Sequence, residues 1–465
     1  MPDRRQLLGA ALGGAAACAA RGDAGRATSS VPVVAAEPAA PADVGFLATE
    51  PLLNVDRARF FMQRDGVDAV VVTDAANVFY ATNHWPSLDR MGFRHSTFAI
   101  LPRDPKRPLT LVMQGFLLYY RYADEVSLPG RVVYPYSEPA AAGDAAPGGI
   151  ESEPLASPIR MHRVVDESLL TPREQRRRTI AAAAQPPSAG ADWALLKAMR
   201  SLSLDGRRIA TDDPVIEATL KRRGFDARFT DAEDLLRWTR LEKTPAEIRL
   251  MRIAARQNVE AAMTAARQAR TAGSTRALRA RFFEAAGRLG NRPVFMVVNG
   301  SSSERFDEPI RDGMAFSIDA VSTFMQYHGD FARTILVGEP REPMRRCTTA
   351  IHTAWDEIRS RLRPGMAFGE VQRIGRESMR SQGADFTVGF GPHSVGLYHS
   401  DHPSPSLTAG RSLAGLTLVE NMVLSVDCPV LDTGIGGTAH LEDLVLIGRD
   451  GATPLHDVPA NVVVV

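Results

Sequence analysis

Four acidic residues and one histidine lie in or beside short apolar segments of the C-terminal half, where ionisable side chains are uncommon. They are Asp319, Asp330, His393, Asp427 and Glu442. Carboxylates that lie close together in a half-buried sheet repel one another and are costly to remove from water. If the chain folds so that these side chains meet, we therefore expect them to share a cation.

Two hairpins would bring the acidic residues together in pairs. Asp330 follows Asp319 by eleven residues, so a turn at the midpoint, near residues 324–325, would place the two carboxylates face to face across adjacent strands. Asp427 and Glu442 lie fifteen residues apart around the segment Thr-Gly-Ile-Gly-Gly, and a hairpin there would pair them in the same way.

The ligand types narrow the choice of metal. Carboxylate oxygens and an imidazole nitrogen, here from His393, are hard to borderline ligands, which suit manganese, cobalt, zinc or iron(II) better than a thiolate-selected metal. On spacing alone a second interpretation remains open, in which the acids pair with Arg333 and with surface bases.

The elements that must position these residues begin with an α/β pattern. A helix over 55–65 leads into a buried strand over 67–72, and further strands are predicted over 96–101 and 109–113. Such alternation is typical of an α/β domain. The segment 136–160 is rich in Pro, Gly, Ala and Ser and predicts a loop insertion.

A domain boundary is predicted near residue 240. Thr244 can cap a helix whose first position is Pro245, and Glu247 completes a capping box. Beyond this helix, short apolar strands and amphipathic helices indicate an α+β domain without a nucleotide-binding GxGxxG or P-loop motif. We expect strands over 294–298, 315–320, 331–337, 422–426 and 441–446, and helices over 275–288, 346–362 and 368–381.

The bulk composition is that of a two-domain globular protein. The 465 residues are 44% apolar and 23% charged, and one hydrophobic core rarely supports a chain of this length. Lys and Arg total 55 against 54 Asp and Glu, so no net charge is available to hold nucleic acid, and we expect no nucleic-acid partner. The three cysteines form no CxxC pair, which excludes a disulfide scaffold and a cysteine zinc site.

The N-terminus predicts a targeting segment. A pair of arginines precedes an apolar, Ala/Gly-rich run through Ala20 that is short for a membrane span, and the pattern resembles a twin-arginine export signal. We therefore expect a signal peptide over 1–22, a flexible spacer over 23–49, and a protein that is exported to the periplasm or secreted. A lipid anchor at Cys18 is a weaker alternative, because alanine rather than leucine stands three residues before it.

The metal-ligand candidates resemble the pita-bread metallopeptidase family, which includes methionine aminopeptidase, Xaa-Pro aminopeptidase and prolidase, with creatinase as a relative. In that family two acids eleven residues apart, the second followed by x-x-Arg-Thr, are ligands, and they are similar to Asp319 and Asp330. The family's His-x-x-Gly-Leu block resembles the segment that starts at His393, and its two late acidic ligands resemble Asp427 and Glu442.

This resemblance implies a fold, a cofactor and an activity. The fold is an α+β pita-bread catalytic domain over 241–465, preceded by an α/β creatinase-type N-terminal domain over 50–240. The cofactor is a pair of divalent metal ions per chain, manganese first, with cobalt, zinc and iron as alternatives, which Asp330 and Glu442 would bridge. The activity is metal-dependent hydrolysis at Xaa-Pro bonds of short peptides, by an aminopeptidase or dipeptidase that forms a homodimer.

The resemblance also implies two catalytic residues and shows four departures. His399 is similar to a second histidine that contacts substrate in the family, and Asp427 stands where a glutamate ligand also shuttles a proton. The departures are that shorter aspartate, His440 in place of an arginine, Ala320 in place of a glycine, and no histidine ahead of Asp319 of the kind that many proline-specific members carry.

Two alternatives follow from the comparison with this family. One is a metal-independent hydrolase like creatinase, acting on a small C–N bond, and it predicts the loss of metal ligands. The other is a catalytically silent binding protein that keeps the fold. The shorter side chain of Asp427 and the missing histidine favour the second alternative.

Overall fold

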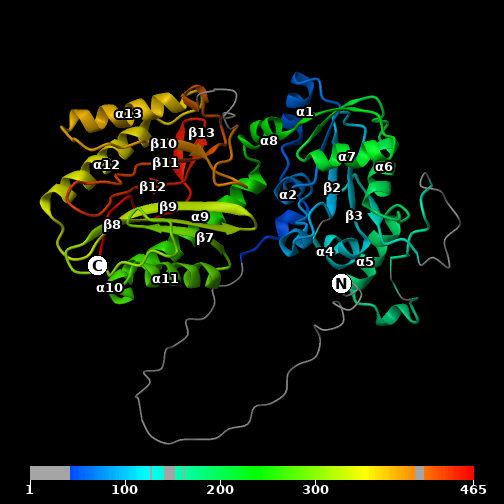
Figure 1. Ribbon diagram of the computed structural model, residues 1–465, viewed down its shortest axis with the longest axis horizontal. Helices are drawn as coiled ribbons and strands as arrows, with labels where there is room; N and C mark the ends of the chain where they lie inside the picture. Colours follow the sequence, from blue (N-terminus) through cyan, green and yellow to red (C-terminus); the bar gives the residue numbers. More distant parts are fainter. Residues whose placement is uncertain (1–41, 126–127, 141–151, 160, 162, 404–412) are drawn as a thin grey trace, which may run out of the picture. The chain divides into compact units, whose positions relative to one another are not determined.

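The computed structural model describes residues 42–465 except 126–127, 141–151, 160, 162 and 404–412 (Figure 1). The predicted signal peptide, Cys18 and most of the predicted spacer lie outside the described residues, and so does much of the predicted loop insertion. The packed chain begins before residue 50, because the 3-10 turn Gly45–Ala48 buries Leu47, whose carbonyl oxygen accepts a hydrogen bond from the side chain of Asn83. Among the described residues, no helix has the length and apolar character that a membrane span requires.

The first half of the described chain is built on one mixed sheet. Its strands lie in the order β4 (Arg131–Tyr136), β3 (Leu109–Gln114), β2 (Thr97–Pro102), β1 (Ala69–Val72), β5 (Arg208–Thr211) and β6 (Arg228–Asp231). Central β1 pairs antiparallel with β2 and parallel with β5. All four residues of β1 are buried, as expected for a strand covered by helices on both faces.

Helices cover this sheet and connect its strands. They are α1 (Val55–Arg64), α2 (Ala75–Thr82), α3 (Gly115–Leu117), α4 (Ala123–Glu125), α5 (Pro172–Ala183), α6 (Ala191–Ser201), α7 (Pro214–Arg222) and α8 (Glu233–Arg240), with a π-helical turn at Leu118–Tyr122. Helix α2 begins where the Asp74 side chain accepts two backbone N–H groups, and it ends at Asn83 in the left-handed region. The predicted α/β class of this half is confirmed.

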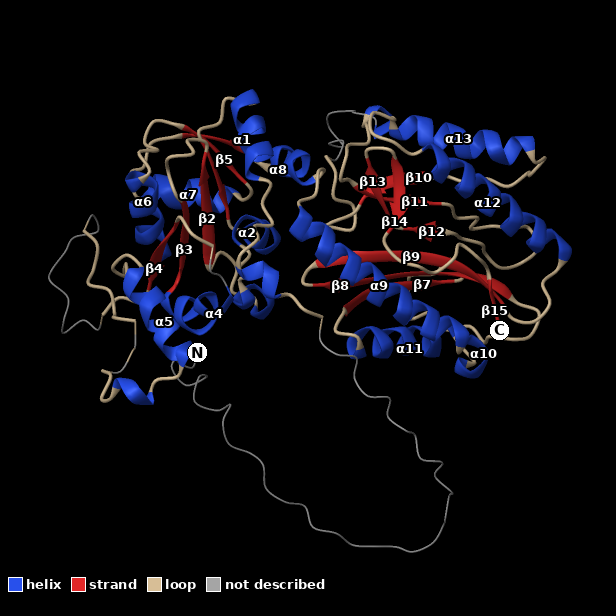
Figure 2. Ribbon diagram, turned by 180° about the vertical axis from the view of Figure 1, so that it is seen from behind, coloured by secondary structure: helices blue, strands red, loops and turns tan. Residues whose placement is uncertain are grey.

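The second half begins with the capping box predicted from the sequence. The Thr244 hydroxyl accepts the backbone N–H of Glu247, whose carboxylate accepts that of Thr244, and α9 (Pro245–Arg267) follows. Helices α10 (Ala269–Ala272) and α11 (Thr275–Arg288) come next. Figure 2 shows α9 and α11 on the same side of a sheet formed by β12 (Glu442–Asp443), β9 (Tyr327–Leu336), β8 (Ala315–Phe324) and β7 (Arg292–Val298), with β15 (Val463–Val464) beside β9.

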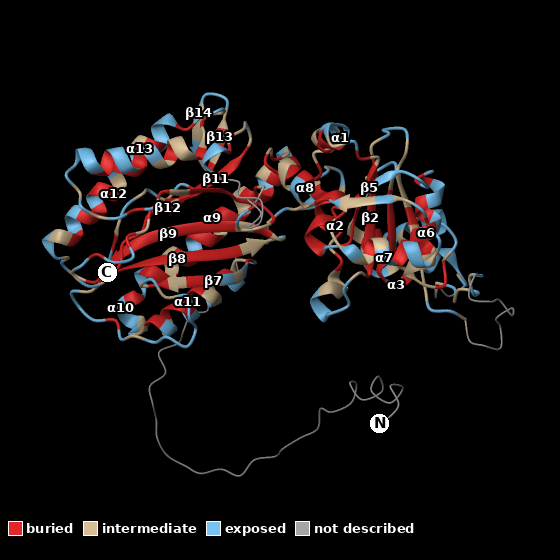
Figure 3. Ribbon diagram, turned by 45° about the horizontal axis from the view of Figure 1, so that its top comes forward, coloured by how far each residue is buried: buried red, intermediate tan, exposed pale blue. Residues whose placement is uncertain are grey.

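A smaller sheet completes the second half. Its strands are β10 (Gly391–Ser394), β11 (Val423–Asp427), β13 (Val445–Gly448) and β14 (Gly451–Pro454), and α12 (Glu342–Arg361) and α13 (Phe368–Ser381) lie on its outer side (Figure 2). In Figure 3 the strands of both sheets are mostly buried and the helices expose one face. Strands between two outer layers of helix confirm the predicted α+β class.

One predicted strand proves to be two. The segment expected to be continuous over 441–446 divides into β12, which pairs with β9, and β13, which pairs with β11. The chain crosses from one sheet to the other at Leu444, which is fully buried. The prediction of one strand was wrong because a continuous apolar run does not reveal that its two ends pair with different neighbours.

Candidate metal centre

The β8–β9 hairpin positions the first two acidic residues. Its two-residue turn consists of Met325 and Gln326, both with positive φ, at 46° and 71°. Two consecutive left-handed residues form the kind of turn whose twist matches that of the flanking strands. The resulting register pairs Asp319 with Ala332, not with Asp330. The predicted midpoint was one residue too early, so the two carboxylates share a face of the sheet but lie diagonally across it.

His393 joins the second acidic pair to the first. Strand β10 pairs antiparallel with β11, and the His393 side chain reaches three carboxylates. Its Nε2 atom lies 3.5 Å from Asp427 Oδ2, 3.4 Å from Glu442 Oε1 and 3.6 Å from Asp330 Oδ2. The two segments that carry Asp427 and Glu442 therefore meet, as the hairpin argument predicted, although β12 itself belongs to the other sheet.

A second imidazole that was not proposed as a ligand also enters the cluster. His440 is 6% exposed, and its Nε2 atom lies 3.5 Å from Asp427 Oδ1 and 3.8 Å from Glu442 Oε2. Its backbone is fixed to β9, because its N–H donates to the Thr334 hydroxyl, which in turn donates to the His440 carbonyl. The available signal was the spacing, since residues 440 and 442 of an extended chain project to the same side.

The donor set fits a divalent cation. Three groups each offer ligand atoms within 4.8 Å of one another: Asp330 with His393 and His399, Asp319 with His440 and Glu442, and His393 with Asp427 and Glu442. Among the described residues, several buried side-chain atoms that make no hydrogen bond belong to this cluster. They include Asp319 Oδ1, Asp330 Oδ1, His393 Nε2, His440 Nε2 and Glu442 Oε2. Buried polar atoms without partners are costly, and a metal ion coordinated by them would remove that cost.

The alternative partner considered for the acids, Arg333, is engaged elsewhere. Its guanidinium lies 2.6 Å from an oxygen of Asp443, and it also donates to the Glu442 carbonyl oxygen at 3.0 Å. The interpretation that Arg333 neutralises the clustered acids is therefore wrong. This buried pair instead ties β12 to β9 and so fixes the backbone that carries Glu442.

The carboxylates of the cluster differ in their affinity for protons. Burial, followed by repulsion from Asp330, raises the pKa of Asp319 to about 7, and burial also raises that of Glu442 well above its usual value. Burial acts in the same direction on Asp330, but the His399 and His393 imidazoles outweigh it and lower the pKa of this carboxyl. Asp319 and Glu442 thus hold protons that a bound cation would displace.

Two hydrogen bonds orient side chains of the cluster. His393 Nδ1 donates to the His399 carbonyl oxygen at 3.1 Å, which leaves Nε2 as the nitrogen that faces the carboxylates. The Ser425 hydroxyl donates to Glu442 Oε1. Outer contacts of this kind set the tautomer and direction of metal-binding groups.

Two histidines of the loop after β10, His399 and His402, have different surroundings. His399 Nε2 lies 3.0 Å from Asp330 Oδ2, and its partly exposed ring contacts the rings of Phe295 and His328, with centroid separations of 5.7 and 6.3 Å. His402 is buried, packs against Phe368, and accepts the Ser394 N–H at Nδ1. Burial lowers the pKa of His402 to about 4, consistent with a neutral structural histidine.

A buried ionic network holds the same loop. Asp401 accepts a hydrogen bond from Arg240 at 2.8 Å and lies 3.3 Å from the Lys243 ammonium, and all three side chains are fully buried. Burial would raise the pKa of Asp401, but the two cations hold it well below its usual range. The network lies two residues from His399 and so restrains the loop that presents it.

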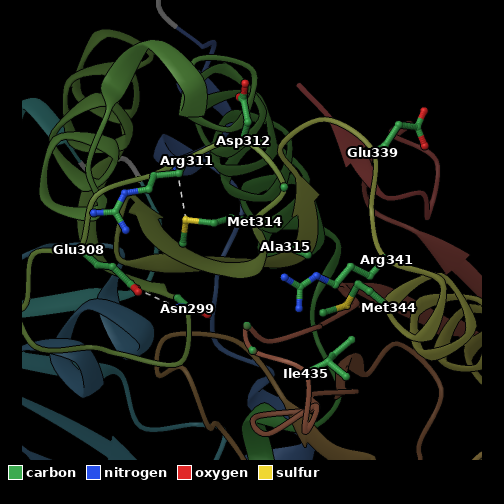
Figure 4. A pocket seen from close by; sticks show the side chains of 13 residues that line it. Asn299, Glu308, Arg311, Asp312, Met314, Ala315, Glu339, Arg341, Met344 and Ile435 are labelled. Carbon is green, nitrogen blue, oxygen red and sulfur yellow. Dashed lines mark hydrogen bonds between the residues drawn. The ribbon is translucent and has the colours of Figure 1, made fainter.

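A separate pocket of about 510 Å³ lies at the start of β8 (Figure 4). The described residues that line it include Glu308, Arg311 and Glu339 and no member of the acidic cluster. Glu308 accepts a hydrogen bond from the Asn299 side chain at its wall. The charged residues that line this pocket are of both signs, and none of the described residues that line it belongs to a group of converging metal-ligand atoms.

Comparison with known proteins agrees with this geometry. Residues 249–449 match the model of metallopeptidase family M24, and residues 54–156 match that of the creatinase/prolidase N-terminal domain. The chain belongs to metallopeptidase family M24. The M24 model spans all five predicted ligands, and the N-terminal domain model covers residues 54–156 of the α/β half.

Individual relatives of this M24 chain are distant. The probable dipeptidase PepE of Mycobacterium tuberculosis is 29% identical over 161 residues, which cover 34% of this chain and only 41% of that protein. The Xaa-Pro dipeptidase of Pyrococcus furiosus is 25% identical over 272 residues, 57% of this chain and 75% of that protein.

Solved structures show the fold of this M24 chain. The prolidase from Pyrococcus horikoshii superposes with a TM-score of 0.60 at 18% identity, covering 88% of this chain and 99% of that one. Dipeptidase PepE from Mycobacterium ulcerans gives 0.58 at 17% identity, covering 91% and 99%. These similarities confirm the predicted fold, in which a creatinase-type N-terminal domain precedes a pita-bread catalytic domain in the chain.

Proposed function

We propose that this protein is a metal-dependent peptidase that cleaves Xaa-Pro bonds of short peptides, as an aminopeptidase or a dipeptidase. The observation that carries the proposal is the convergence of five separate segments on one cluster of carboxylates and imidazole. Membership of family M24 supports peptide hydrolysis, and the similarity to an Xaa-Pro dipeptidase over 57% of the chain supports the substrate class.

A dinuclear metal site is part of the proposal. Asp330 and Glu442, the two fully buried carboxylates, would bridge two ions, with Asp319 completing one and His393 and Asp427 the other. A pair of divalent ions held there, manganese being the first candidate, would lower the pKa of water and polarise the scissile carbonyl group.

The two accessible polar residues of the site would act on the substrate. The His399 side chain is 38% exposed, so its ring can reach a bound peptide and donate a hydrogen bond to it while Asp330 orients the ring. The Asp427 side chain is 36% exposed, whereas Glu442 is buried. Asp427 can therefore accept a proton from water and deliver it to the leaving amine.

Hydrolysis of matched dipeptides tests this function. Protein loaded with manganese should cleave Xaa-Pro dipeptides with a kcat/KM at least about tenfold above that for Xaa-Ala dipeptides, since about 1.4 kcal/mol of selective binding suffices for that ratio. A chelator should abolish the activity. Asp330→Asn should lose it, whereas Asp312→Asn, a change at an exposed acid on the same domain, should keep it.

Two other results would separate the alternatives. Turnover that persists after complete removal of metal would favour a metal-independent hydrolase. Two bound ions without hydrolysis of any dipeptide would favour a silent binding protein, the alternative that the short Asp427 side chain supports.

A further inference from the structure

We propose that His440 is an additional metal ligand, so that the centre holds two imidazole nitrogens, from His393 and His440, rather than one. This inference rests on the proposed metal site and adds a sixth protein ligand to it. The nitrogen would bind a divalent ion together with Asp427 and Glu442.

The distances place His440 at coordination range. Its Nε2 atom lies 3.5 Å from Asp427 Oδ1 and 3.8 Å from Glu442 Oε2. Two ligands that each bind one ion at about 2.0–2.2 Å lie about 3–3.5 Å apart in tetrahedral or octahedral geometry. The spacing of the His440 and Asp427 atoms thus suits a shared ion.

The burial of His440 supplies a second, independent observation. The residue is 6% exposed, and its Nε2 atom is buried without a hydrogen-bond partner in the described part of the chain. Its separation of 3.8 Å from Glu442 Oε2 exceeds hydrogen-bond length. A buried imidazole nitrogen that faces carboxylates without bonding to them is costly unless a further group occupies the space between them.

The backbone around His440 holds the ring in place. The Thr334 hydroxyl of β9 both accepts from the His440 N–H and donates to its carbonyl. Because Asp330 lies on the same strand, the restraint fixes the position of His440 relative to the bridging carboxylate. A ligand that is preorganised in this way loses little conformational entropy when an ion binds.

Charge balance explains why a neutral donor suits this position. Four carboxylates already match the charge of two divalent ions, so a further carboxylate would leave the buried site negative. The short side chain of Asp427 is 36% exposed, so it leaves part of the cluster open to solvent. A neutral nitrogen from His440 adds coordination there without adding charge.

Proton NMR of the cobalt(II)-loaded full chain in water counts the bound imidazoles. Each histidine bound to cobalt through Nε2 contributes one strongly shifted Nδ1–H signal, and the burial of His393 and His440 slows exchange of that proton with water. We expect two such signals in the unmodified protein and one in His440→Gln. The control His352→Gln changes a histidine of α12 outside the cluster and should keep both signals.

A variant whose residue 440 can still bind metal distinguishes loss of coordination from a purely structural effect of replacing His440. In His440→Cys the thiolate would bind cobalt and add a sulfur-to-metal charge-transfer band in the near ultraviolet. The buried Cys347 and Cys428 should give no such band in the unmodified protein. A shifted spectrum without the new band in this variant would count against the proposal.

The outcomes separate this inference from the proposed function. Cobalt bound with only one shifted imidazole signal, unchanged in His440→Gln, would overturn the role of His440 while leaving the metal site intact. No cobalt bound by the unmodified protein would overturn the metal site itself. Because the signal count of the unmodified protein is decisive, failure of a variant to fold does not prevent the test.

Discussion

His393 Nδ1 donates a hydrogen bond to the backbone carbonyl of His399, with 3.1 Å between the two atoms. The His393 ring, which faces three carboxylates, is thus oriented by the backbone of His399, whose own side chain contacts Asp330 and is partly exposed. One loop therefore links metal binding to substrate contact, and the two functions can be separated by mutation, because the His399 ring is not needed for this hydrogen bond.

Replacing His399 by alanine should impair turnover more than metal binding. The backbone carbonyl that orients His393 remains, so the stoichiometry of bound metal should stay unchanged. Loss of the ring removes a hydrogen-bond donor to the reacting peptide, and kcat/KM should fall by about 10²–10³-fold. Elemental analysis and dipeptide kinetics on the same preparation check both parts. A loss of metal equal to the loss of activity would show that the ring acts as a ligand.

Metal should stabilise the protein more at pH 8 than at pH 6. The folded pKa of Asp319, about 7, lies above its ordinary value of 3.8, so ionisation of this group destabilises the metal-free fold progressively as pH rises through that window. The pKa of His399, raised to about 8 by Asp330 against the opposing effect of burial, changes stability in the same direction, because its contribution is lost above that pH.

Calorimetry with and without manganese measures this difference directly. A bound cation removes the repulsion among the ionised carboxylates, so the gain in Tm should grow between pH 6 and pH 8. Equal gains at the two pH values would mean that the cluster does not hold these protons in the metal-free state.

Asp401→Asn should destabilise the fold strongly. The substitution leaves Arg240 and Lys243 as buried cations without a carboxylate, and breaking a buried pair in this way typically costs about 3–5 kcal/mol. As a matched control, Asp356→Asn removes an acid from an exposed pair with Arg359 and should cost less than about 1 kcal/mol. The free energies of unfolding of the two variants are compared by urea denaturation. Similar unfolding midpoints would contradict a stabilising role of the buried network.

Gly375→Ala should destabilise the outer helical layer. A Cβ atom at this position in α13 would lie 2.5 Å from the ring of Phe390, and overpacking of a rigid core typically costs about 1–3 kcal/mol. Gly287→Ala in α11 is the control, because a Cβ there meets no atom within 4 Å and should stabilise the helix by up to about 1 kcal/mol. Thermal melting should shift in opposite directions in the two variants.

The sequence allowed the cluster to be predicted because ionisable residues stand out in apolar strands. Asp319, Asp330 and Glu442 interrupt buried segments, and their spacing suited hairpins whatever the details of pairing. The register of the first hairpin was missed, since its turn residues Met325 and Gln326 lack the glycine or asparagine that usually marks consecutive left-handed positions.

The spacing in the sequence indicates that His440 lies on the same side of the chain as Glu442, but not that it lies beside Asp427, because that contact depends on long-range pairing. The His440 side chain reaches Asp427 only because β12 pairs with β9 while β13 pairs with β11, a division that the apolar run over 441–446 conceals. The predicted export signal, the possibility of a lipid anchor at Cys18 and the homodimer stay predictions, and the first two lie outside the described residues.

The metal content of the protein tests the central claim most directly. Elemental analysis after loading with manganese and removal of unbound ions should find about two ions per chain, the number a bridged dinuclear site requires. Asp330→Asn should lose them, and Asp312→Asn should not. A metal-free protein after loading, or an Asp330→Asn variant that retains both ions, would contradict the account.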